Sequence, residues 1–192
     1  QSAALQTFGK DASYAGQAAD ILTNSANQSS AEIVDVAAAM QQGGTVAHQF
    51  GLTMGDTAAS IAIMANNGIK GSDAGTLLKT TLQSITDQGN PAQAAIKQLG
   101  LTVYDTNGKF VGMSSLFGQL QTASKRMTDE QYQAATAVLF GSDAMRITGI
   151  AAKEGSKGFD EMNAKMLKQG SAAKTAAAQT AGLPGAFERA KN

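Results

Sequence analysis

Glycine recurs in this chain at the ends of short stretches with helical apolar periodicity. The sequence holds 21 glycines but only two prolines in 192 residues. Because glycine readily adopts the left-handed conformation that ends a helix, this spacing predicts a series of short helices. We expect helix breaks at Gly43 and Gly44, Gly68, Gly71, Gly100, Gly141 and Gly155.

Helices of about a dozen residues each carry an apolar stripe that must pack against a neighbour. The chain is therefore expected to fold back on itself as a mainly α, compact array of short helices, with a radius of gyration of about 16 Å. Alanine is the commonest residue and aromatic residues make up only 5%. The core is accordingly predicted to be thin and helical, with the methionines filling it.

Three stretches have the spacing of a capping box. In this motif the residue before the helix and the third helical residue each accept, through the side chain, a hydrogen bond from the backbone amide of the other. The first is Ser29 to Glu32, with Glu32 at the third helical position. The second runs from Thr53 to Asp56, and the third from Thr128 to Gln131. Each predicts a helix start.

One stretch departs from the helical pattern. Residues 101–104 (Leu-Thr-Val-Tyr) alternate with a period of two, and Asp105-Thr106-Asn107-Gly108 has turn chemistry. Residues 109–111 can pair back, so we expect one small β-hairpin near residues 101–111. Asn107 and Gly108 are the residues that tolerate positive φ, and both are predicted to adopt it in the turn. Together with Gly68, Gly71 and Gly141, they are the structural turn residues that we single out.

The charges exclude several classes of function. Fifteen basic residues balance fifteen acidic ones, and there is no cysteine and only one histidine, His48. A chain with zero net charge is not expected to bind nucleic acid or anionic lipid strongly by electrostatic attraction. Disulfides, thiolate metal sites and a cysteine nucleophile are also excluded. His48 is interpreted as an interior or boundary histidine, because no second ligand or base accompanies it.

No motif points to catalysis. The calcium-loop pattern that starts at Asp105 has Leu116 at its twelfth position, where a bidentate Glu is required. The acidic pairs Asp129-Glu130 and Asp160-Glu161 are interpreted as first-turn residues that favour the helix dipole. No serine lies in a G-x-S-x-G elbow. We therefore expect no enzyme activity, no catalytic residues, no cofactor and no metal.

The chain divides by composition into three parts. Residues 1–13 are interpreted as the N-terminal lead-in of an excised fragment, because the sequence opens Gln1-Ser2-Ala3 without an initiator Met. Residues 14–168 are predicted to form a helical core domain. Residues 169–192 are rich in alanine and have helix propensity but little apolar surface to bury. They are predicted to start a helical extension.

Three blocks of sequence together resemble the core region of bacteriophage tail tape measure proteins. They are residues 64–78 (Met-Ala-Asn-Asn-Gly-Ile-Lys-Gly-Ser-Asp-Ala-Gly-Thr-Leu-Leu), residues 99–109, and residues 128–141. The block Asn-Gly-Ile-Lys-Gly-Ser is the most specific part, and the likeness covers roughly residues 14–166.

The resemblance implies a structural component of a phage or prophage tail that acts in tail assembly, tail-length determination and genome ejection. Implied partners are the tail tube protein, tail assembly chaperones, tail-tip proteins and further copies of itself. Sequence-specific nucleic acid binding is not expected, and membrane contact is expected only at ejection. The implied location is the tail tube lumen of the virion, and the host cytoplasm during assembly.

Two other interpretations fit the composition. One is a helical protein-binding module of a bacterial secreted or surface protein. The weaker one is a membrane-active segment rich in Ala and Gly. A much longer parent chain full of helical sequence would favour the tail protein, whereas a signal peptide and repeated modules would favour the binding module.

Overall fold

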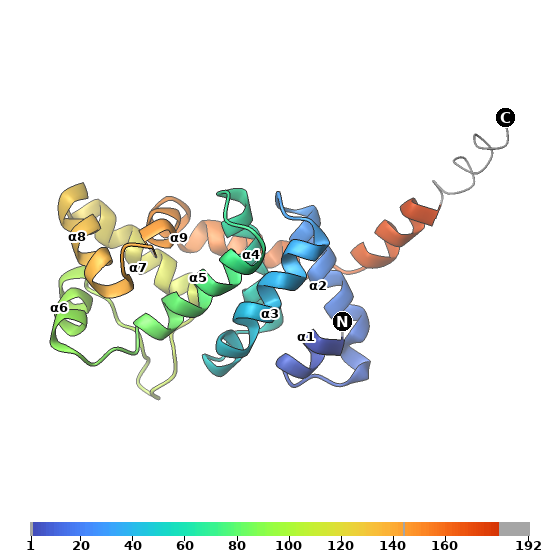
Figure 1. Ribbon diagram of the computed structural model, residues 1–192, viewed down its shortest axis with the longest axis horizontal. Helices are drawn as coiled ribbons and strands as arrows, with labels where there is room; N and C mark the ends of the chain where they lie inside the picture. Colours follow the sequence, from blue (N-terminus) through green and yellow to red (C-terminus); the bar gives the residue numbers. More distant parts are fainter. Residues whose placement is uncertain (1, 144, 181–192) are drawn as a thin grey trace.

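The computed structural model describes residues 2–143 and 145–180, and these are arranged as packed helices (Figure 1). The mainly α fold of short helices is confirmed. In chain order the elements are α1 (Ser2–Thr7), the 3-10 helix η1 (Ala12–Tyr14), α2 (Ala15–Asn27), α3 (Ile33–Gln49), α4 (Met54–Asn66), α5 (Gly71–Ser84), α6 (Asn90–Leu99), α7 (Met113–Arg126), α8 (Asp129–Phe140) and α9 (Met145–Met166). Residues 171–180 form a further helix beyond α9.

Helix α4 lies at the centre of the described part of the chain. It contacts α2, α3, α5 and α9, and all of its residues except Asp56 and Asn66 are buried or nearly so. Helices α1 to α3 lie towards one end of the molecule and α6 to α8 towards the other (Figure 1). The long helix α9 bridges them, because it contacts α7 and α8 as well as α4 and α2.

The core is built largely from small side chains, as the composition predicts. Alanines of four packed helices are fully buried, among them Ala18, Ala39, Ala58, Ala62 and Ala151. The largest buried side chains are Phe117 of α7 and Phe159 of α9, whose rings meet edge to face with centroids 5.5 Å apart. Met162 and Met166 are buried too, which confirms their role as core filler. Small side chains let the helices approach closely, so backbone contacts become part of the packing.

Two of the predicted helix starts are confirmed as capping boxes. The Thr53 hydroxyl accepts the Asp56 amide at 3.0 Å, and the Asp56 carboxylate accepts the Thr53 amide at 3.0 Å. Thr128 and Gln131 exchange the same pair of bonds, both at 3.1 Å. These contacts are local, which is why the sequence alone locates them.

The predicted register of the third capping box is wrong. Helix α3 begins at Ile33, so Glu32 is the residue before the helix and Asp35 occupies its third position. The Glu32 amide donates to the Asp35 carboxylate at 2.9 Å. The Ser29 hydroxyl is used elsewhere: it donates to the Ser25 carbonyl in the last turns of α2 at 2.6 Å and accepts the Ala31 amide at 3.1 Å. The connection between α2 and α3 therefore engages the predicted cap.

The predicted break at Gly43 and Gly44 is wrong. Helix α3 runs through both residues to Gln49, because this part of α3 crosses α5 at very short range. A Cβ atom on Gly43 would lie 2.6 Å from the Gly75 carbonyl oxygen of α5. A glycine in a helix interior costs about 0.5–1 kcal/mol relative to alanine. The close packing that it permits outweighs that cost here.

The predicted β-hairpin is not supported, since the described residues contain no β-strand. A single antiparallel bridge joins Tyr104 and Phe110, and Val111 donates its amide to the Val103 carbonyl at 3.0 Å. The ladder stops there because Gly112, with φ 97°, turns the chain directly into α7. Leu101 and Val103 are both buried.

The turn itself is also only partly as predicted. Gly108 has φ 74°, whereas no described residue other than glycine has positive φ, so the prediction for Asn107 is wrong. The Asp105 side chain accounts for the difference. It accepts the amides of Asn107 at 2.8 Å and Lys109 at 3.0 Å, an arrangement that closes the turn with one left-handed residue.

Candidate functional site

The sequence-predicted turn residues lie in separate connections and form no common site. Gly68 (φ 84°) follows α4, Gly71 (φ 62°) begins α5, and Gly141 (φ 86°) follows α8. Gly108 lies at the tip of the loop between α6 and α7. Each of these glycines shapes a local connection, and the structure does not bring them together.

The acidic residues considered for metal binding or catalysis are dispersed. Within residues 2–143 and 145–180 no three His, Cys, Asp or Glu side chains lie close enough to hold a metal ion. The Asp105 carboxylate is occupied by the amides of its own loop. Asp129 and Glu130 lie in the first turn of α8, as predicted. Asp160 and Glu161 do not begin a helix; they lie inside α9, so that interpretation is wrong.

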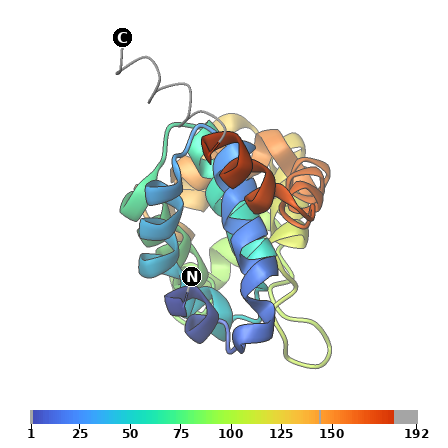
Figure 2. The same ribbon diagram turned by 90° about the vertical axis from the view of Figure 1, so that its right-hand side faces the viewer.

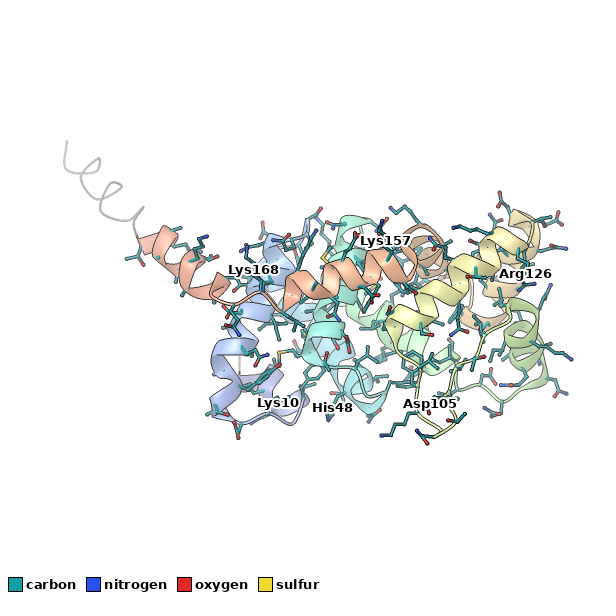
Figure 3. The ribbon with its side chains drawn as sticks, turned by 180° about the vertical axis from the view of Figure 1, so that it is seen from behind. Lys10, His48, Asp105, Arg126, Lys157 and Lys168 are labelled. Atoms are coloured by element: carbon teal, nitrogen blue, oxygen red, sulfur yellow. The ribbon has the colours of Figure 1, made fainter. Side chains whose placement is uncertain are left out.

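His48 is exposed near the end of α3, so of the two interpretations, interior or boundary, the interior one is wrong. Its ring meets Phe8 edge to face with centroids 5.7 Å apart. In Figure 3 it lies on the same side of the molecule as the Asp105 loop, away from Lys157 and Arg126. This position suits a packing contact with the segment that follows α1.

An open cleft of about 630 Å³ lies between α6, α7 and α9 and is lined by three cations and no acid. Lys97, Arg126 and Lys157 supply the charges; two of them are labelled in Figure 3. The Arg126 guanidinium donates to the Gln98 carbonyl at 3.1 Å. Lys97 and Arg126 also lie in the last turns of their helices, where cations interact favourably with the unpaired carbonyls. Helix capping therefore explains two of the three cations.

One ion pair connects α9 to α5. The Arg146 guanidinium donates to both carboxylate oxygens of Asp73, at 2.9 and 3.1 Å, and lies 3.4 Å from Asp143. These hydrogen bonds lower the pKa of Asp73 below its ordinary value and raise the pKa of Arg146. Both side chains are partly exposed, so the pair orients the start of α9 more than it stabilises the fold.

An aromatic cluster marks the most prominent loop. The rings of Phe50 and Phe110 meet edge to face at 5.7 Å, and Tyr104 beside them is 39% exposed. These side chains line an open cleft of about 590 Å³ together with Lys109. The loop extends beyond the helices, as the yellow-green segment of Figure 2 shows. Such a surface can contact another protein through its aromatic side chains.

Two features that matter for the structure were missed by the sequence analysis. The first is the close contact of Gly43 with Gly75 across α3 and α5. The second is the buried Asn24 of α2, whose side chain contacts the end of α9. A signal for the first was present, since Gly43 and Gly44 interrupt an apolar pattern that continues beyond them. The second had the weaker signal of polar residues at helical spacing.

None of the described helices has the length and apolar character needed to span a bilayer. No solved structure matches the chain.

Comparison with known sequences gives a consistent result. The sequence profile of the family described as "Phage-related minor tail protein" matches residues 1–141. The chain is also 34% identical over 173 residues to a protein named "Tape measure protein" from Pneumococcus phage Dp-1. That alignment covers 90% of this chain but 15% of the relative, so the chain spans a small part of the relative's length. These matches favour a tail protein over the binding module and the membrane-active segment, and the chain belongs to the phage-related minor tail protein family.

Proposed function

We propose that this chain is the core segment of a tape measure protein, acting in tail assembly, tail-length determination and genome ejection. The observation that carries the proposal is the 34% identity that extends over 90% of the chain to a protein of that name. The proposed location is the lumen of the tail tube in the virion and the host cytoplasm during assembly. The proposed partners are the tail tube protein, assembly chaperones, tail-tip proteins and further copies of the chain.

Within that role, we infer that this segment is a folded domain and not the part that sets length. A length-setting helix rises about 1.5 Å per residue, so α9, whose 22 residues are interrupted by the kink at Gly155, spans less than about 33 Å. The other helices are shorter and pack across one another, with α3 on α5 and α7 on α9. Small-angle scattering of the isolated chain should give a radius of gyration near 16 Å, and a rod-like profile would contradict this inference.

The proposal is tested in a phage that encodes the full parent protein. Gly75→Val places a side chain against the backbone of α3 and is expected to prevent folding of this segment. Gly149→Ala is the matched control, because a Cβ atom there meets nothing within 4 Å. Electron microscopy of lysates should show capsids without complete tails for Gly75→Val and normal virions for Gly149→Ala.

Tail length gives a second readout that separates the two parts of the proposal. Deletion of the codons for residues 14–168 should reduce the number of complete tails, while any tails that form keep their native length. Shortened tails would contradict the inference that the length-setting stretch lies elsewhere. Infectious virions with normal tails after the deletion would overturn the proposed assembly role itself.

A further inference from the structure

One face of α2 carries three polar side chains that contact the segment leaving α9. Asp20, Asn24 and Asn27 are spaced at positions i, i+4 and i+7, which places them on a single helix face. Their partners lie between Met166 and Thr175, more than 140 residues later in the chain. A polar stripe on α2 thus faces the end of one helix and the start of the next.

Asn24 holds the end of α9. Its side-chain amide donates to the Met166 carbonyl at 2.9 Å and to the Lys168 carbonyl at 2.8 Å. The last carbonyls of a helix have no partner within the helix, and a buried group must find one. Asn24 is only 1% exposed, so water does not compete freely for these bonds.

Asp20 holds the start of the helix that follows. Its two carboxylate oxygens accept the amides of Gly170 at 3.1 Å and Ala172 at 2.9 Å. A carboxylate at this position satisfies otherwise unpaired amides and interacts favourably with the helix dipole. Two turns further along α2, the Asn27 side chain donates to the Thr175 hydroxyl at 3.3 Å.

The helix formed by residues 171–180 has no apolar face to set its direction. It is rich in alanine, and its side chains from Ala176 onward are all exposed. A ten-residue helix of this kind is marginal on its own in water. The helix nevertheless leaves the body at a defined angle beside α2 (Figure 1), just beyond Lys168 in the view of Figure 3.

We propose that α2 is a docking platform that fixes the direction in which the chain leaves the folded body, with Asp20 and Asn24 as its positioning residues. The helix of residues 171–180, here called the exit helix, lacks an apolar contact with the body. The polar stripe on α2 takes the place of that contact. The body and the exit helix then behave as one rigid unit. This inference does not depend on the proposed function.

The absence of cysteine from the sequence makes a direct test simple. Thr45→Cys on α3 and Gln179→Cys on the exit helix are both exposed positions, and spin labels there report the orientation of the helix. Double electron–electron resonance should give one narrow distance distribution. Asp20→Ala should widen it at least about twofold, because two of the anchoring bonds are lost. Gln17→Ala, an exposed residue one turn earlier on α2, is the control and should leave it unchanged.

Amide hydrogen exchange separates positioning from folding. In Asp20→Ala the amides of Gly170 and Ala172 should exchange about tenfold faster, while the amides of α4 keep their protection. Asp20→Asn retains one acceptor oxygen. Its spin-label distance distribution should have a width between those of the unsubstituted chain and of Asp20→Ala. A broad distance distribution in the unsubstituted body, or an unchanged one in Asp20→Ala, would overturn the proposal.

Discussion

Two helix crossings hold this fold together, and both depend on glycine in different ways. Where α3 crosses α5, a Cβ atom on Gly75 would collide with the Ala39 carbonyl and lie 2.8 Å from the Cβ of Gln42. Where α7 crosses α9, a Cβ atom on Gly118 would meet the Ser156 hydroxyl, and one on Gly155 would meet the Gln121 side chain. The first crossing is backbone against backbone, and the second is backbone against side chain.

The difference lies in which atoms can move. The Ala39 carbonyl is fixed by the hydrogen bonds of α3, whereas Gln121 and Ser156 can change rotamer. The second crossing also supplies hydrogen bonds that α9 loses at its kink. Gly155 adopts φ 61° and ψ −168° inside α9, and the Gln121 amide donates to the freed carbonyls of Ala152 at 3.1 Å and Lys153 at 3.3 Å. The predicted break at Gly155 is thus confirmed: two helical segments of α9 meet there at a kink, which a side chain of the neighbouring helix stabilises.

The largest effect is expected at the rigid crossing. Gly75→Ala should lower the free energy of unfolding by about 3 kcal/mol, because neither backbone can move without disturbing its own helix. Chemical denaturation followed by circular dichroism measures the change. Gly16→Ala is the control, since its Cβ atom meets nothing within 4 Å and alanine favours a helix. Equal stability of the two variants would show that α3 and α5 can separate at low cost.

A smaller effect is expected at the adaptable crossing. Gly155→Ala should cost about 2 kcal/mol, because the backbone conformation disfavours a side chain and Gln121 must also move. Gln121→Ala alone should cost about 1 kcal/mol through the loss of its two hydrogen bonds. If the Gln121 side chain is the obstacle, the double variant should lose less free energy of unfolding than the sum of the losses in the two single variants. Strict additivity would show that only the backbone conformation matters.

Gly108 isolates the backbone contribution. It has φ 74°, and a Cβ atom there meets nothing within 4 Å. Gly108→Val should therefore cost on the order of 1 kcal/mol from conformation alone. Thermal unfolding measures this cost. An unchanged melting midpoint would mean that the loop adopts another turn without loss.

The smallest effect is expected for the ion pair between the two crossings. The lowered pKa of Asp73 means that its contribution is present above the ordinary carboxyl range, near pH 4, and is lost as pH falls through the lowered value. Because both side chains are partly exposed, Arg146→Gln should cost less than about 0.5 kcal/mol at neutral pH. Denaturation should show a smaller difference between the two proteins at pH 2.5 than at pH 7. A difference of equal size at both pH values would assign it to packing.

Local rules located much of the helical pattern. The capping boxes at Thr53 and Thr128 are complete within four residues, so the sequence contains every atom that decides them. The breaks at Gly68, Gly100 and Gly141 follow from the same local preference for positive φ. The resemblance to tail proteins also rests on short contiguous blocks, and the family match agrees with it.

Contacts between distant residues decided the rest. Glycine ends a helix at Gly100 but lies inside a continuous helix at Gly43. The close approach of Gly75 is what distinguishes the second position from the first. The strand-like pattern at residues 101–111 yields a single bridge because α7 begins directly after it. The direction of the exit helix depends on Asp20 and Asn24, which lie some 145 residues away in the chain. Sequence determines which conformations each segment tolerates, whereas packing and hydrogen bonding between segments select among them, because these energies exist only once the helices meet.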